Sequence, residues 1–107
     1  MKKGFGGGMQ QLMRQANQMQ LKMKKLQEEL DTREWDGTSG GGAVKVKVNG
    51  KYQLTQVNID PEVIDKDDQE MLQDMVLSAA NEALKEAKTV SEEEMSKISG
   101  GLGIMGM

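Results

Sequence analysis

A repeat of apolar residues every seven positions between Met9 and Leu30 is the feature that most constrains this chain. Two interleaved series make up the repeat: Met9, Ala16, Met23 and Leu30, and, three positions after each of the first three, Leu12, Met19 and Leu26. Such spacing is typical of a long helix with one apolar seam. A helix from Met9 to about Glu34 would be roughly 39 Å long at 1.5 Å per residue. A small domain cannot cover that length, so we expect the far end of the helix either to pack on a partner chain or to project into solvent.

Positive charge is concentrated in the same part of the chain. Residues 1–27 contain no acid and six bases, which are Lys2, Lys3, Arg14, Lys22, Lys24 and Lys25. All 17 acids lie in the remaining residues, so the net charge of −3 conceals a basic front and an acidic remainder. The simplest interpretation is a solvated helix face, but such faces normally mix both signs. Cations and glutamines without carboxylates instead suit a polyanion such as DNA.

The middle of the chain predicts a small antiparallel sheet. Residues 44–48 alternate valine with lysine, as a strand with one buried face does. Asn49-Gly50 is the signal of a two-residue type I′ hairpin turn. The returning strand would run over residues 51–60, with a bulge near Thr55-Gln56 where the alternation slips by one position. Residues 33–38 are expected to form a short first strand.

A second helix is expected after Pro61, which ends the last strand. Asp67 or Asp68 can cap this helix, and an apolar face rich in alanine continues to residue 87. The predicted fold class is α+β, with a long N-terminal helix, a three-stranded antiparallel meander and a C-terminal helix. We expect one domain over residues 9–98, a flexible glycine-rich leader over residues 1–8 and a flexible Gly/Met tail over residues 99–107.

Composition argues against catalysis and against cofactors. The chain has no cysteine and no histidine, which removes thiol nucleophiles, imidazole bases and the usual zinc ligands. The acids of residues 65–70 lack the glycine and distant glutamate of a calcium loop, so helix capping explains them better. Gly101, Gly103 and Gly106 match a dinucleotide-binding spacing without the required strand and helix. We therefore predict no enzyme activity, no cofactor, no metal, no small-molecule substrate and no membrane partner, in a cytoplasmic protein.

Four stretches, taken in order, resemble the YbaB/EbfC family of bacterial nucleoid-associated DNA-binding proteins. They read MRQANQMQLKMKKLQEEL, DGTSGGGAVKVKVNG, VNIDPEVID and DQEMLQDMVLSAANEALKEA. The resemblance implies a homodimer with a tweezer-like body, located at the nucleoid, which binds double-stranded DNA with limited sequence preference and alters its conformation. It further implies roles in nucleoid organisation and in gene expression.

The resemblance implicates both terminal helices in DNA contact, but only the first is basic here. In the last helix, glutamates outnumber Lys85, Lys88 and Lys97. We therefore predict that DNA is contacted by Lys2, Lys3, Arg14, Lys22, Lys24 and Lys25. The alternative is a protein-interaction or assembly module, in which the apolar seam binds a partner helix without direct DNA contact.

Overall fold

Two long helices and a three-stranded sheet make up the chain. A computed structural model describes the backbone of residues 2–106 and the side-chain surroundings of residues 8–98. The elements follow in the order α1 (Lys2–Thr32), β1 (Glu34–Ser39), η1 (Gly40–Gly42), β2 (Val44–Asn49), β3 (Leu54–Ile59), η2 (Pro61–Val63) and α2 (Gln69–Gly106). The α+β class and the predicted order of helix, meander and helix are confirmed.

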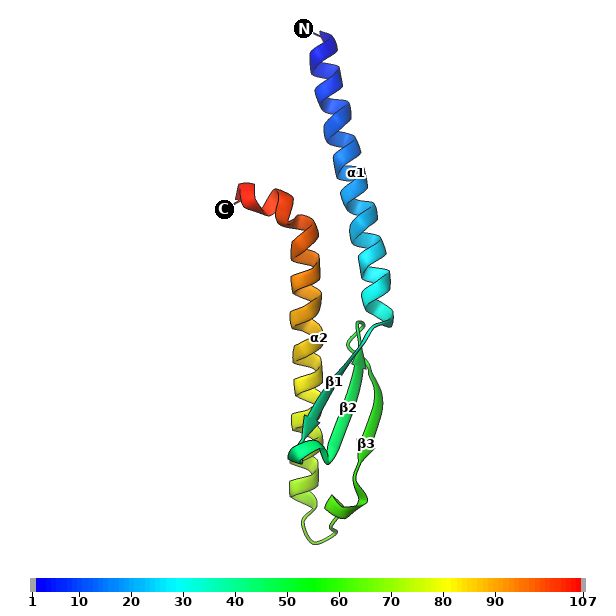
Figure 1. Ribbon diagram of the computed structural model, residues 1–107, viewed down its shortest axis with the longest axis vertical. Helices are drawn as coiled ribbons and strands as arrows, with labels where there is room; N and C mark the ends of the chain where they lie inside the picture. The colour runs from blue at the N-terminus through cyan, green and yellow to red at the C-terminus, as the bar shows by residue number, and fades with distance from the viewer. Residues whose placement is uncertain (1, 107) are drawn as a thin grey trace.

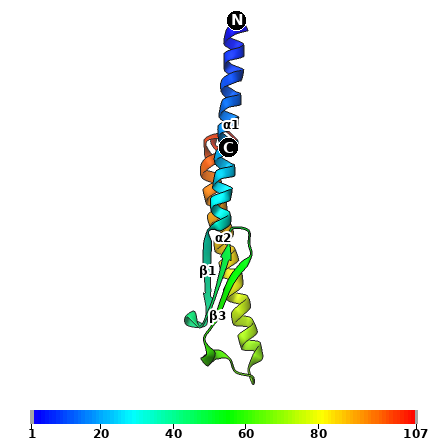
Figure 2. The same ribbon diagram turned by 90° about the vertical axis from the view of Figure 1, so that its right-hand side faces the viewer.

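The molecule is elongated because the helices extend beyond the sheet. Its extents are 80 × 26 × 16 Å and its radius of gyration is 21.6 Å, against about 13 Å for a compact domain of ~100 residues. The first part of α2 packs on the sheet, and its later part runs beside α1 in the opposite direction (Figure 1). The N-terminal part of α1 extends past the end of α2 (Figures 1 and 2).

The sheet has the order β1-β2-β3, with both pairs antiparallel. Lys47 pairs with Gln56 while Val48 pairs with Leu54, so Thr55 is an extra residue in β3. The predicted bulge at Thr55-Gln56 is therefore confirmed, and so is the predicted first strand. The helix α2 covers the face of β1 and β2, whereas β3 stays largely exposed.

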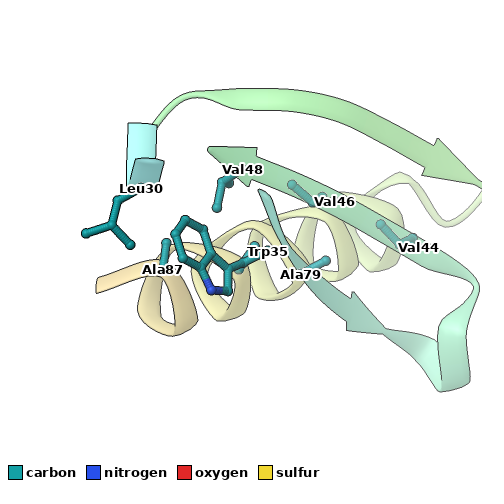
Figure 3. Close-up of a cluster of buried hydrophobic side chains, with 8 residues drawn as sticks. Leu30, Trp35, Val44, Val46, Val48, Ala79 and Ala87 are labelled. Atoms are coloured by element: carbon teal, nitrogen blue, oxygen red, sulfur yellow. The ribbon is translucent and has the colours of Figure 1, made fainter. Parts of the chain in front are cut away.

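Eight buried side chains form the core between α2, the sheet and the end of α1 (Figure 3). They are Leu30, Trp35, Val44, Val46, Val48, Ala79, Ala83 and Ala87. The three valines are those whose alternation with lysine predicted a buried strand face. Alanines on α2 allow the helix to approach the sheet closely, and Gly37 on β1 completes this fit. A β-carbon at Gly37 would overlap the backbone of Ala79 and Ala83.

The β2–β3 connection differs from the predicted two-residue turn. Tyr52 N donates to Asn49 O at 3.0 Å, and Asn49 N donates to Gln53 O at 3.0 Å, which closes a three-residue loop. The residue with positive φ is Tyr52, at 62°. Gly50 is needed for another reason, because a β-carbon there would overlap the carbonyl of Leu30. Packing against the end of α1 therefore overrides the turn that the Asn-Gly pair favours.

Both helices are longer than the sequence predicted. The helix α1 begins at Lys2 instead of near Met9, and α2 continues to Gly106 instead of ending near residue 98. The flexibility assigned to residues 1–8 and 99–107 stays a prediction. At the start of α2, Asp68 Oδ1 accepts a hydrogen bond from Met71 N at 3.3 Å, which confirms one of the two predicted caps.

Candidate nucleic-acid interface

The outer face of α1 carries the predicted DNA-binding cations. At about 100° per residue, Arg14 and Lys25 point in nearly the same direction, roughly opposite Met23 on the seam. Lys22 and Lys24 lie on either flank of this face. The contacts of α1 are with α2 and β2, and Arg14, Lys22, Lys24 and Lys25 are all exposed, so this face is directed to solvent.

Within the described residues, no ion pair neutralises Arg14, Lys22, Lys24 or Lys25. Arg14, Lys22, Lys24 and Lys25 are exposed. Within residues 8–98, the ion pair that the structure contains is on α2, between Lys97 Nζ and Glu94 Oε1 at 3.3 Å. Four positive charges are therefore available to an external anion. Lys2 and Lys3, the other two predicted contacts, have side chains outside the described residues.

Acids surround the end of α1 and limit the extent of the basic surface. Glu28, Glu29 and Asp31 follow Lys25 within two turns, and Asp31 accepts a hydrogen bond from Gln27 Nε2 at 2.8 Å. Glu34, at the start of β1, accepts a hydrogen bond from the hydroxyl of Thr55. The described basic surface thus covers residues 14–25 and ends where the helix meets the sheet.

The apolar seam divides into a covered and an uncovered half. Leu30 is 1% exposed, and Met19, Met23 and Leu26 are partly buried toward α2. The other predicted seam residues are Met9, Leu12 and Ala16, and all three are exposed. The seam is therefore part of the core only near the sheet, and its far end is left uncovered by this chain.

A cleft lies between the seam of α1 and the end of α2. Its volume is about 480 Å³, and its lining residues are Leu12, Gln15, Ala16, Gln18, Met19, Lys22 and Ile98. Sequence reasoning did not identify this cleft. The signal was present in the seam residues of α1 and in Ile98 of α2, but only the antiparallel arrangement of the two helices brings them together.

A second apolar surface, also missed from the sequence, lies between β3 and the start of α2. This groove of about 470 Å³ is lined by Ile59, Gln69, Leu72, Gln73, Val76, Leu77 and Ala80. Leu54 and Val57 of β3 are 48% and 44% exposed beside it. The strand β3 contains no charged residue, and its outer edge is unpaired. Such an edge is normally protected by charge, proline or a covering segment.

Other kinds of site find no support in the described part of the chain. No group of three or more acidic side chains there is arranged to hold a metal ion. Within the same residues, neither long helix combines the length and apolar character that crossing a bilayer requires. Asp65 and Asp68 instead accept backbone hydrogen bonds from Asp67 N and Met71 N, at 2.9 and 3.3 Å.

Comparisons with known proteins agree with one another. The sequence profile of the YbaB/EbfC DNA-binding family matches residues 5–102. A nucleoid-associated protein of Clostridium novyi is 51% identical over 106 residues, which cover 97% of this chain and 93% of that protein. One of Caldanaerobacter subterraneus is 50% identical over 108 residues, which cover 99% and 97% of the two chains.

A solved structure shares the fold. The crystal structure of an uncharacterized protein from Helicobacter pylori superposes with a TM-score of 0.61 at 27% sequence identity. The match covers 73% of this chain and 90% of that chain.

Proposed function

This chain belongs to the YbaB/EbfC DNA-binding family, and from that membership we propose that it is a nucleoid-associated protein that binds double-stranded DNA. The resemblance seen in the sequence is thus confirmed. The proposed activity has little sequence preference and alters DNA conformation, which contributes to nucleoid organisation and to regulation of gene expression. Lack of enzyme activity stays a prediction that fits a DNA-binding family.

The observation that carries the proposal is the unpaired, exposed cationic face of α1. Lysine and arginine side chains that meet phosphates release condensed counterions, and this release drives binding without reading sequence. Glutamine and asparagine between the cations can donate to phosphates without repelling them. Because all 17 acids lie outside residues 1–27, the remainder of the molecule repels DNA and directs it to α1.

We assign the proposed homodimer to the surface formed by β3 and its neighbouring groove. Leu54, Val57 and Leu77 expose apolar side chains there, and the backbone edge of β3 is open. If β3 of a second copy pairs antiparallel with this β3, the free backbone groups of both strands form hydrogen bonds. Each copy then also covers the groove of the other through the same set of contacts, as a two-fold symmetric interface requires. Absence of charge along β3 is what allows the strand to meet its own copy.

Salt-dependent DNA affinity tests the cationic face. If the six predicted cations neutralise six phosphates, log K falls with log salt at a slope of about −5. Replacing Lys22, Lys24 and Lys25 by glutamine should make the slope shallower by about 2.7, since each phosphate contributes about 0.9. The matched control replaces Lys85, Lys88 and Lys97 of α2 by glutamine. An equal loss in both variants would contradict the assignment to α1.

Solution mass tests the dimer surface. Val57→Lys should give monomers, because it places a charge on the apolar side of β3 next to the groove. Thr38→Lys is the control, since Thr38 lies exposed on β1, away from β3. A wild-type protein that is monomeric at micromolar concentration, or a Val57→Lys variant that keeps the wild-type mass, would reject this interface.

A second candidate function is supported by the uncovered half of the seam. Met9, Leu12 and Met13 are 58%, 65% and 63% exposed and lie along one side of α1, next to the cleft. An amphipathic partner helix could cover them, which would make the chain an assembly module without direct DNA contact. Failure of the wild-type protein to shift any duplex at low salt would favour this function over DNA binding.

A further inference from the structure

Leu21 is an aliphatic residue of α1 that has no role in packing. It is 66% exposed, and it lies outside the apolar seam. Nine positions separate it from the buried Leu30, which places the two side chains on opposite sides of the helix at about 100° per residue. One exposed leucine is ordinary on a protein surface. Leu21 is unusual because it lies among the cations that are predicted to contact DNA.

The nearest neighbours of Leu21 on α1 are the amides Asn17 and Gln18 and the cations Lys24 and Lys25. Arg14, Gln18 and Lys25 are seven and three positions before it and four positions after it, so all lie within about 60° of it around the helix. All four side chains are exposed. The cationic face therefore has an aliphatic centre with hydrogen-bond donors around it, and the first acid on this side is Glu28, two turns after Leu21, where the basic surface ends.

This combination matches the chemistry of the major groove of DNA. Guanine presents acceptors that suit arginine, adenine presents a donor and an acceptor that suit glutamine, and thymine presents a 5-methyl group that suits aliphatic side chains. Phosphates alone would give Leu21 nothing to contact. A helix with its side chains is about 10–12 Å across, which fits a major groove about 12 Å wide.

The outer face of α1 can reach a groove because its described residues from Arg14 to Lys25 are exposed on that side. Every residue from Gly8 to Gln18 is exposed, and α2 runs beside α1 (Figure 1), where Ile98 lines a cleft with the seam residues Leu12 and Met19. We propose that α1 lies in the major groove and that Leu21 packs against thymine 5-methyl groups. The inference rests on the proposed DNA binding and adds a preference for thymine that phosphate contacts alone do not produce.

Paired duplexes that differ only in the methyl group test this inference. One duplex consists of A·T pairs, and the other has deoxyuridine in place of every thymine. The methyl groups are then missing wherever along the duplex the protein binds. The wild-type protein should bind the thymine duplex about three to four times more tightly for each methyl group that Leu21 covers, as expected from burial of one methyl group. The slope of log K against log salt should be the same for both duplexes.

The variant Leu21→Ala should lose this preference, while the matched control Leu12→Ala, on the seam of the same helix, should keep it. The affinities of the wild-type protein and of Leu21→Ala for each of the two duplexes form a double-mutant cycle, in which any effect of duplex shape alone cancels. Equal wild-type affinity for the two duplexes would overturn the inference, as would a preference that survives Leu21→Ala. A changed solution mass for Leu21→Ala would also overturn it, because Leu21 would then contact a second copy.

The same experiment separates this inference from the proposed function. If both duplexes bind equally well and glutamine at positions 22, 24 and 25 weakens both, phosphate binding by α1 stands and groove contact by Leu21 fails. If the wild-type protein binds neither duplex at low salt, the proposed function fails and the inference fails with it.

Discussion

The body and the arm of this molecule differ in how far contacts within the chain explain their choice of amino acids. The body is the sheet with residues 69–90 of α2 and Leu30, and its eight core side chains contact one another. The arm is residues 8–18 of α1, in which every side chain is exposed. Residues of the body are set by contacts within the chain. Residues of the arm lie outside the core cluster, so packing within the chain does not explain their exposed apolar side chains or the cations that continue along α1 from Arg14 to Lys25.

Glycine shows this contrast most strongly. Gly37→Ala in the body should cost at least about 4 kcal/mol of folding stability, because the new β-carbon overlaps backbone atoms of Ala79 and Ala83 that cannot rotate away. Gly8→Ala in the arm meets nothing within 4 Å, and alanine favours a helix by up to about 1 kcal/mol. Chemical denaturation of both variants measures the difference. A stable Gly37→Ala protein would mean that α2 and β1 are not closely packed.

The second test compares two leucines of α1, one in the body and one in the arm. Leu30→Ala should cost about 3 kcal/mol, since a fully buried leucine is removed. Leu12→Ala, at 65% exposure, should change the stability of the monomer by less than about 0.5 kcal/mol. Thermal unfolding at low protein concentration distinguishes the two. A large loss for Leu12→Ala would show that a second copy covers the seam, and would sharpen the boundary of the arm.

Amide hydrogen exchange compares the two regions without any substitution. In the absence of DNA, amides of residues 12–18 should be at least about a hundredfold less protected than those of residues 79–87. The reason is that a helix without tertiary contacts is only marginally stable in water. Addition of DNA should raise protection in the arm and leave the body unchanged. Equal protection of both regions before DNA is added would remove the distinction.

The smallest expected effect concerns the cap of α2. Asp68→Ala should cost about 1 kcal/mol, because it removes the acceptor for Met71 N. Asp67→Ala is the matched control, since the cap is Asp68 and not its neighbour. Urea midpoints for the two variants check this. An equal loss in both would mean that the acids stabilise the helix through their charge and not through this hydrogen bond.

Regular patterns in the sequence predicted most of the body. The alternation of valine and lysine over residues 44–48 predicted which face of β2 is buried, because side-chain direction in a strand has a period of two. The slip near Thr55 predicted the bulge, and Pro61 predicted the end of β3. These signals are local, so they do not depend on where the rest of the chain lies.

Contacts between distant segments explain where the predictions failed. Asn49-Gly50 favours a two-residue turn on its own, but Gly50 packs against the carbonyl of Leu30, twenty positions earlier, and the loop takes three residues. The two apolar surfaces, at the cleft and beside β3, were also missed. Each joins residues far apart in the sequence, as when Leu12 and Ile98 line the same cleft.

The sequence by itself determined the amphipathic helix, the order of the elements and the separation of positive from negative charge, since each of these follows from residue spacing along one segment. Only the tertiary structure decided which half of the seam is buried, which of the described cations lack an ion-pair partner and which strands form the two edges of the sheet. Those properties depend on distances between segments, and spacing along the chain does not contain them.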